Sequence, residues 1–143
     1  MTDQPQPPYL VRLGEMQEDA AKLLFYSLPP EGWAVCTLEY REAGPVSEVF
    51  ARMIDSDGNM QPVKVSPALI NALRDIRKYM ATNNDSVWYS AFLKIENGRF
   101  SFDFNYDQKP QWRVEPSDEA YIADLSKYPR QKDQIPDWYP RVP

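Results

Sequence analysis

The chain has 143 residues, a formal net charge of −5, no histidine and a single cysteine, Cys36. It therefore cannot build a Ser-His-Asp or Cys-His nucleophile, a histidine-ligated metal site, a thiolate zinc site or an intrachain disulfide. The negative charge argues against nucleic-acid binding, and no apolar run approaches the ~20 residues that cross a bilayer. Because the N-terminus lacks the basic and apolar regions of a signal peptide, we expect a cytoplasmic protein, and one that is not an enzyme and needs no metal or cofactor.

The first part of the chain predicts a helix followed by strands. Residues 1–8 are polar and proline-rich, so we expect them to be disordered or poorly anchored, with a single domain over residues 9–143. Apolar residues at helical spacing predict a helix from Tyr9 to Leu28, which Pro29-Pro30 ends. Alternating β-formers then predict three strands, over Trp33 to Tyr40, Val46 to Ile54 and about Met60 to Val65.

Three positions in these strands have a specific expectation. Cys36 falls on the apolar side of the first strand, so we expect a small core residue. Pro62 cannot donate a ladder hydrogen bond, so its strand should be an edge strand or contain a bulge. The run Asp55 to Asn59 has the chemistry of a hairpin turn and lacks the glycine and glutamate positions of a calcium loop.

A second helix begins after Ser66, a good N-cap residue, with Pro67 at the first helical position. Its apolar stripe is formed by residues at helical spacing, namely Leu69, Leu73, Ile76 and Met80. We expect the basic residues between them to face solvent, namely Arg74, Arg77 and Lys78.

The run from Val87 to Tyr106 predicts a long β-hairpin around Asn97-Gly98, because a type I′ turn needs positive φ at both central positions. This turn sets the cross-strand pairs, from Glu96 opposite Arg99 to Tyr89 opposite Tyr106. One face of the hairpin is then almost wholly apolar, and a slip of one residue would invert it. The hairpin should therefore be the main structural unit of an antiparallel sheet with one buried face.

Beyond the hairpin we expect an ordered loop over residues 107–116 and a short helix from Ser117 to about Ser126. Trp138 and Tyr139 are too apolar for a disordered linker, so the proline-rich tail should lie across the body of the domain. The expected fold is a single α+β domain with an antiparallel sheet of about five strands, helices on one face and an ordered Pro/Trp/Tyr-rich C-terminal tail.

Acidic side chains are concentrated in the C-terminal half, at Asp103, Asp107, Asp118, Glu119 and Asp124. They form either ordinary solvated surface or a recognition face for a basic protein, in which carboxylates steer association and aromatic rings anchor the partner. For the second hypothesis we select as partner-binding residues Asp103, Asp107, Trp112, Asp118, Glu119 and Trp138.

A family resemblance rests on Trp88, Phe92, Gly98, Phe100 and the run 102–107, together with the order of helix, Leu28-to-Trp33 strand entry, hairpin and second helix. In these features the chain resembles the YezG-like immunity (antitoxin) proteins over roughly residues 9–138. The tail, which contains Tyr128-Pro129-Arg130 and Ile135 to Trp138, is similar to tails of that group. The resemblance implies a bacterial cytoplasmic protein that binds and neutralises a cognate polymorphic toxin, often a nuclease, encoded by a neighbouring gene.

Two other classes of function stay open. The aromatic sheet face could hold a small ligand in a non-catalytic binding or adaptor domain, which a pocket of several hundred cubic ångströms under the hairpin would favour. A carboxylate-dependent hydrolase would need two carboxylates that converge in a closed cleft.

Overall fold

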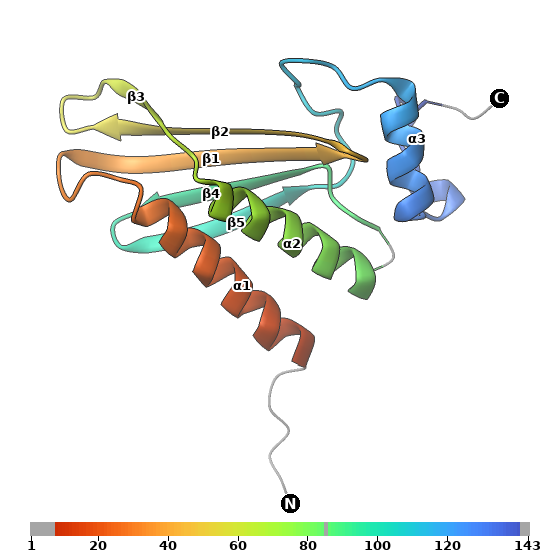
Figure 1. The fold of residues 1–143 in the computed structure, drawn as a ribbon, viewed down its shortest axis with the longest axis horizontal. Coiled ribbons are helices and arrows are strands. Elements are labelled where there is room, and N and C mark those ends of the chain that lie inside the picture. Colours follow the sequence, from red (N-terminus) through yellow and green to blue (C-terminus); the bar gives the residue numbers. More distant parts are fainter. Residues whose placement is uncertain (1–7, 85, 141–143) are drawn as a thin grey trace, which may run out of the picture.

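The computed structural model describes residues 8–84 and 86–140, which form a single α+β domain (Figure 1). Its elements in chain order are α1 (Pro8–Phe25), β1 (Trp33–Ala43), β2 (Val46–Asp55), β3 (Met60–Val63), α2 (Pro67–Asn83), β4 (Ser90–Glu96), β5 (Arg99–Asn105), α3 (Asp118–Lys127) and a short 3-10 turn, η1 (Lys132–Gln134). The expected poorly anchored N-terminus, residues 1–8, lies outside the described residues except for Pro8, the first residue of α1. No described helix has the length and apolar character needed to span a bilayer.

The sheet has five strands in the order β3-β2-β1-β4-β5, and neighbouring strands are antiparallel. Helices α1 and α2 lie side by side against one face of the sheet, and α3 lies beside the end where β1 meets β2 (Figure 1). The expected fold class is confirmed. Pro62 lies in β3, which is an edge strand of only four residues, as the sequence predicted.

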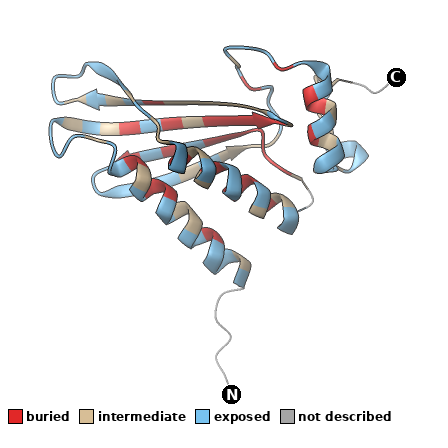
Figure 2. Ribbon diagram, in the orientation of Figure 1, coloured by how far each residue is buried: buried red, intermediate tan, exposed pale blue. Residues whose placement is uncertain are grey.

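Apolar side chains from α1, α2 and the inner face of the sheet form the main core, which is red in Figure 2. Cys36 lies within it, fully buried, and burial raises the pKa of its thiol to about 11. The stripe predicted on α2 is buried from Leu69 to Met80. Ser66 caps α2 by accepting a hydrogen bond from the Leu69 main-chain N–H at 3.2 Å.

The β4–β5 hairpin has the predicted register from Glu96 opposite Arg99 to Ala91 opposite Phe104. Asn97 and Gly98 both have positive φ, 54° and 73°, as a type I′ turn requires. The ladder ends where Ser90 lies opposite Asn105, so the predicted pair of Tyr89 with Tyr106 does not form. Tyr89 instead packs against α3 and the end of the chain, because the backbone bends just before β4.

Candidate protein-binding site

Residues 106–140, the C-terminal segment, pack against one end of the sheet and not over its faces (Figure 1). A second cluster joins this segment to the sheet, with Ala43, Tyr89, Tyr121 and Tyr139 buried at its centre. Partly buried side chains surround it, namely Trp112, Leu125, Ile135 and Trp138. Tyr139 is only 3% exposed, so the tail is packed on the domain as expected, but it lies at one end of the sheet and not across the body.

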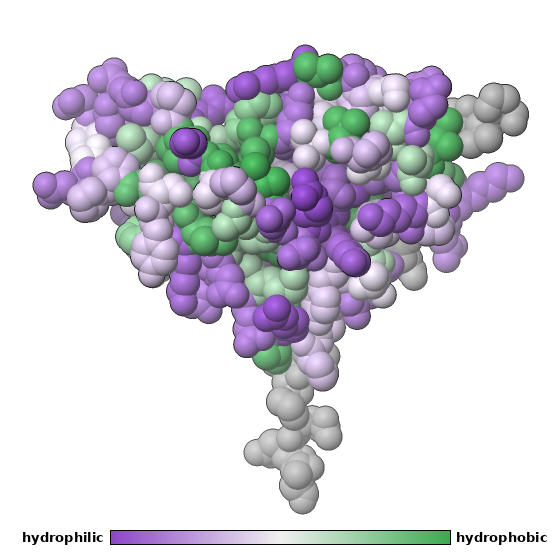
Figure 3. Space-filling view, in the orientation of Figure 1, coloured by the Kyte–Doolittle hydropathy of each residue, from purple (hydrophilic) through white to green (hydrophobic). Residues whose placement is uncertain are grey.

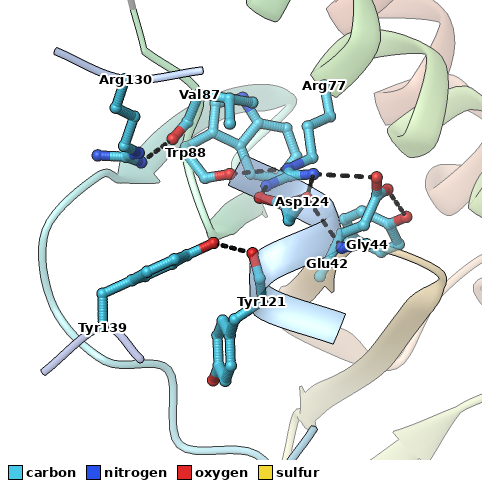
Figure 4. A network of polar contacts seen from close by, with 10 residues as sticks. Glu42, Gly44, Arg77, Val87, Trp88, Tyr121, Asp124, Arg130 and Tyr139 are labelled. Carbon is cyan, nitrogen blue, oxygen red and sulfur yellow. Dashed lines mark hydrogen bonds and ion pairs between the residues drawn. The ribbon is translucent and has the colours of Figure 1, made fainter. Parts of the chain in front are cut away.

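Beneath this cluster lies a buried ion cluster of Arg77, Asp124 and Glu42 (Figure 4). The Arg77 guanidinium binds the Asp124 carboxylate through both oxygens, with N···O distances of 2.6 and 2.9 Å. It also donates to Glu42 at 3.1 Å and to the Trp88 carbonyl at 2.8 Å. These contacts join α3, α2, β1 and the strand entry to β4 at one point.

The ion cluster corrects two expectations from the sequence. Arg77 does not face solvent but is fully buried, and Asp124 is 2% exposed and not part of an acidic surface. Position 77 is four residues after Leu73 and three before Met80, so it falls on the apolar stripe of α2. A charged residue at a stripe position was the available signal for a buried ion pair, but the sequence pattern could not supply its distant partner.

The hydrogen bonds around the ion cluster hold Arg77 in its charged form. Burial disfavours the guanidinium, but the hydrogen bond and charge of Asp124, helped by Glu42, outweigh burial and raise the pKa of Arg77. The Tyr40 hydroxyl donates to the other Glu42 oxygen at 2.5 Å, and burial, with Glu42 beside it, raises the pKa of Tyr40. Two carboxylates therefore converge here on the arginine between them, and Glu42 also lines a hollow of about 360 Å³ with Gly44, Arg74 and Lys127.

Gly44, in the turn between β1 and β2, brings the sheet into direct contact with α3. Its main-chain N–H donates to the Asp124 carboxylate at 2.8 Å, and its φ is +58°. A Cβ atom at this position would collide with the Ala120 carbonyl oxygen. Only glycine allows both this conformation and this close approach.

Arg130 and Tyr139 fasten the end of the segment (Figure 4). Arg130 donates to the carbonyls of Val87 and Tyr106, and its guanidinium lies 4.4 Å from the Tyr89 ring centroid. The Tyr139 hydroxyl donates to the Tyr121 carbonyl. Burial raises the pKa of Tyr139, so this hydroxyl keeps its proton at neutral pH.

Three of the predicted partner-binding residues, Asp107, Trp112 and Trp138, come together around the second cluster. The Trp138 ring makes edge contacts with Tyr89 and Tyr121, and its N–H donates to the Asp107 carbonyl at 2.6 Å. The Trp112 indole N–H is buried and makes no hydrogen bond in the described part of the chain. Both indoles are half-buried and first of all position the segment, whereas the Asp107 side chain is exposed.

Asp118 and Glu119 lie side by side in the first turn of α3, and both are exposed. Ser117 caps this helix through the Ala120 N–H at 3.3 Å, and carboxylates at this end favour the helix dipole. Asp103, in contrast, lies on β5 opposite Phe92, on the sheet face that α1 and α2 leave uncovered. The structure therefore places Asp103 on a different surface from the other predicted acidic residues.

The uncovered face has an aromatic and basic site that the sequence reading missed. The Phe50 ring contacts two guanidinium groups, that of Arg113 at 3.6 Å from the ring centroid and that of Arg41 at 4.7 Å. A shallow hollow of about 230 Å³ beside Phe50 extends to Phe92 and Asp103. Because strand residues alternate between faces, Phe50 lies on the face opposite the buried Ala51. Arg113 comes from the loop, whose path the strand pattern does not give.

Glu48 connects the loop of residues 107–116 to the sheet. Its carboxylate accepts the main-chain N–H groups of Arg113 and Val114, both at 2.9 Å, and pairs with Arg41 at 3.0 Å. Partial burial opposes ionisation of Glu48, but these donors outweigh it and lower its pKa. Loop residues 107–116 are ordered, as predicted, and this carboxylate is one physical reason.

No protein-family model matches the chain, and no curated protein gives a significant match. The fold and site define an α+β domain whose C-terminal segment is held by a buried ion cluster and carries the exposed carboxylates of Asp107, Asp118 and Glu119. Function is therefore inferred from this geometry and from the sequence resemblance.

Proposed function

We propose that this chain is an immunity protein that neutralises a cognate bacterial toxin in the cytoplasm by direct stoichiometric binding. Its binding surface is the exposed side of the C-terminal segment, where Asp107, Asp118 and Glu119 lie. Trp112 and Trp138 present their exposed parts beside these carboxylates, and Asp103 extends the acidic character to the neighbouring sheet face.

The observation that carries this proposal is a set of exposed carboxylates, Asp107, Asp118 and Glu119, on a backbone that is already fixed. The main chain at Asp107 is held by the Asn105 side chain, which accepts its N–H at 3.2 Å, and by Trp138, which donates to its carbonyl. The buried ion cluster holds α3 beneath Asp118 and Glu119. A surface that needs no ordering on binding loses less conformational entropy and binds more tightly.

The charge fits a basic partner. A nuclease toxin needs Lys and Arg to neutralise phosphates, so it presents a positive surface. Carboxylates on the immunity protein would speed the encounter and oppose the wrong partners. The net charge of −5 and the resemblance to YezG-like immunity proteins both agree with this partner.

The test is co-expression with the product of the adjacent candidate toxin gene, read as cell survival and as co-purification. We expect the wild-type chain to protect cells and to form a one-to-one complex. The triple variant Asp107→Asn, Asp118→Asn, Glu119→Gln should bind at least tenfold more weakly, mainly through slower association that depends less on salt.

A matched control removes the same charge elsewhere, with Asp19→Asn, Glu31→Gln and Asp75→Asn, which are exposed positions outside the C-terminal segment. It should protect as the wild type does. Equal death of cells with and without the wild-type chain contradicts the proposal for that toxin, and equal weakening by both triple variants contradicts this placement of the surface.

One observation favours the non-catalytic ligand-binding alternative. A hollow of about 320 Å³ lies between α1 and the hairpin, with Phe25, Ile95 and Phe100 among its walls. Figure 3 shows hydrophobic groups gathered on this side of the molecule, whereas hydrophilic side chains follow the front of α2. A screen of apolar small molecules by NMR shift perturbation, with Phe25→Ser as the control, would reveal such a ligand.

A further inference from the structure

The two edges of the sheet differ in length and chemistry. The β3 edge has four residues and contains Pro62. The β5 edge has seven residues, Arg99–Asn105, and contains no proline or lysine. Natural proteins use short strands, proline and lysine to keep edge strands from pairing, and β5 has none of these features.

The outer edge of β5 presents unused main-chain groups at every second residue. A type I′ turn makes Glu96 and Arg99 a hydrogen-bonded pair, so the odd-numbered residues of β5 bond to β4. The bond from the Tyr89 N–H to the Asn105 carbonyl agrees with this pattern. The N–H and C=O groups of Phe100 and Phe102 therefore point outward, and no other described segment bonds to them.

The side chains along this edge are complementary to themselves. Arg99 and Asp103 are exposed, lie at equal distances on either side of Ser101, and have no ion-pair partner among residues 8–84 and 86–140. All three share the uncovered face, because strand residues alternate between faces. Phe100 and Phe102 lie on the opposite face, and Phe100 is 41% exposed.

We propose that β5 is a dimerisation edge, which pairs with β5 of a second copy of this chain in antiparallel register about Ser101. In this register Phe100 and Phe102 of the second copy exchange main-chain hydrogen bonds, so the two sheets become continuous. Arg99 lies opposite Asp103 of the second copy, and the two-fold axis creates this ion pair twice. The exposed Phe100 ring is covered by Phe102 of the second copy.

Charge pairing favours this register over the other registers that the main-chain hydrogen bonds allow. The outward hydrogen-bonding groups of β5 recur at every second residue. The sum of two paired residue numbers can therefore change only in steps of two, which moves the two-fold axis by one residue. The adjacent registers, centred on Phe100 or Phe102, would place Arg99 opposite Ser101 or Asn105 and leave both charges unpaired. Centring the axis on Asp103, one step further, would place two aspartates directly opposite each other, and like charges in that position are destabilising. Centring it on Ser101 converts both unpaired charges into cross-strand ion pairs.

The test is sedimentation velocity of the full chain over a wide concentration range. We expect the wild type to dimerise reversibly. Arg99→Asp and Asp103→Arg each oppose like charges across the axis, so each should raise the dimer dissociation constant more than tenfold. Arg52→Asp makes the same charge change as Arg99→Asp on β2, away from the edge, and should dimerise as the wild type does.

Mixing the Arg99→Asp and Asp103→Arg variants tests the proposed register directly. When the two single variants are combined, every carboxylate at these positions faces an arginine of the other variant, so a heterodimer should form although neither variant dimerises alone. The double variant R99D/D103R should also dimerise. A wild type that stays monomeric overturns the proposal, and so does a dimer that survives both reversals or single variants that fail to pair when mixed. All of these results are independent of whether a toxin binds.

Discussion

Aliphatic and aromatic side chains from α1, α2 and the sheet build the main core, whereas the C-terminal segment is attached through its smaller aromatic cluster and, in addition, through a buried arginine, two carboxylates and a tyrosine hydroxyl. Apolar contacts are non-directional and tolerate small shifts of the groups involved. A bidentate ion pair has a fixed geometry, and it fails as a unit when one partner is lost. The first region therefore supplies stability, and the second sets the position of a surface.

The largest effect should come from Asp124→Ala. It leaves the buried Arg77 with Glu42 as its remaining carboxylate and removes the acceptor for the Gly44 N–H. Loss of one partner of a buried ion pair costs about 3–5 kcal/mol in the free energy of unfolding. Hydrogen exchange resolved by segment should show the protection of residues 106–140 lost first.

Two further variants show whether the effect of Asp124→Ala is specific to the C-terminal segment. Leu73→Ala in the main core should cost about 2–5 kcal/mol and lower protection in both regions, because α2 also carries Arg77. Asp118→Ala on the exposed side of α3 should cost less than about 1 kcal/mol. If Asp124→Ala lowers protection equally everywhere, the two regions unfold as one unit and the comparison fails.

Gly44→Ala should lower the free energy of unfolding more than Gly58→Ala does. Both glycines have positive φ, +58° and +85°, where alanine costs roughly 1–2 kcal/mol. The added methyl group at Gly58 meets nothing, but at Gly44 it collides with α3, which adds about 1–3 kcal/mol. Urea unfolding should therefore show a larger loss for Gly44→Ala, and equal losses would mean that the contact with α3 contributes little.

The smallest effect concerns pH. Because its folded pKa is lowered, Glu48 contributes stability that is complete above the ordinary glutamate pKa of 4.5 and is lost as pH falls through the folded value. The amide shifts of Arg113 and Val114 should report this loss in an acid titration. Glu48→Gln should remove the titration, whereas Glu96→Gln, which is exposed, should leave it intact; a titration that persists in Glu48→Gln rules out this cause.

The difference between the regions also explains what the sequence could predict. Helix and strand periodicity marked the side chains of the main core, because each belongs to a regular element whose period fixes its face. The Asn97-Gly98 turn likewise fixed the hairpin register, which is correct up to Ser90. These are local rules, and they place α1, α2 and every strand.

The C-terminal segment depends on contacts between residues far apart in the chain. From the sequence alone Asp124 is expected at the surface. The fold buries it against Arg77, which is 47 residues away in the sequence. The sequence pattern assigns Tyr89 to the hairpin ladder, whereas in the fold Tyr139 and Trp138 pack against it. For the candidate site, the sequence therefore identified the exposed carboxylates but could not show that Asp103 lies on another face, or that the indoles are used internally.

Pro62 has a consequence beyond its own short strand. A sheet whose two edge strands can both pair with other chains can add copies without limit and grow into fibrils. Here the β3 border has a proline that has no N–H to offer an incoming strand, so growth can proceed from the β5 side alone. Association through β5 would therefore stop after one addition, which would protect this β-rich protein from polymerising.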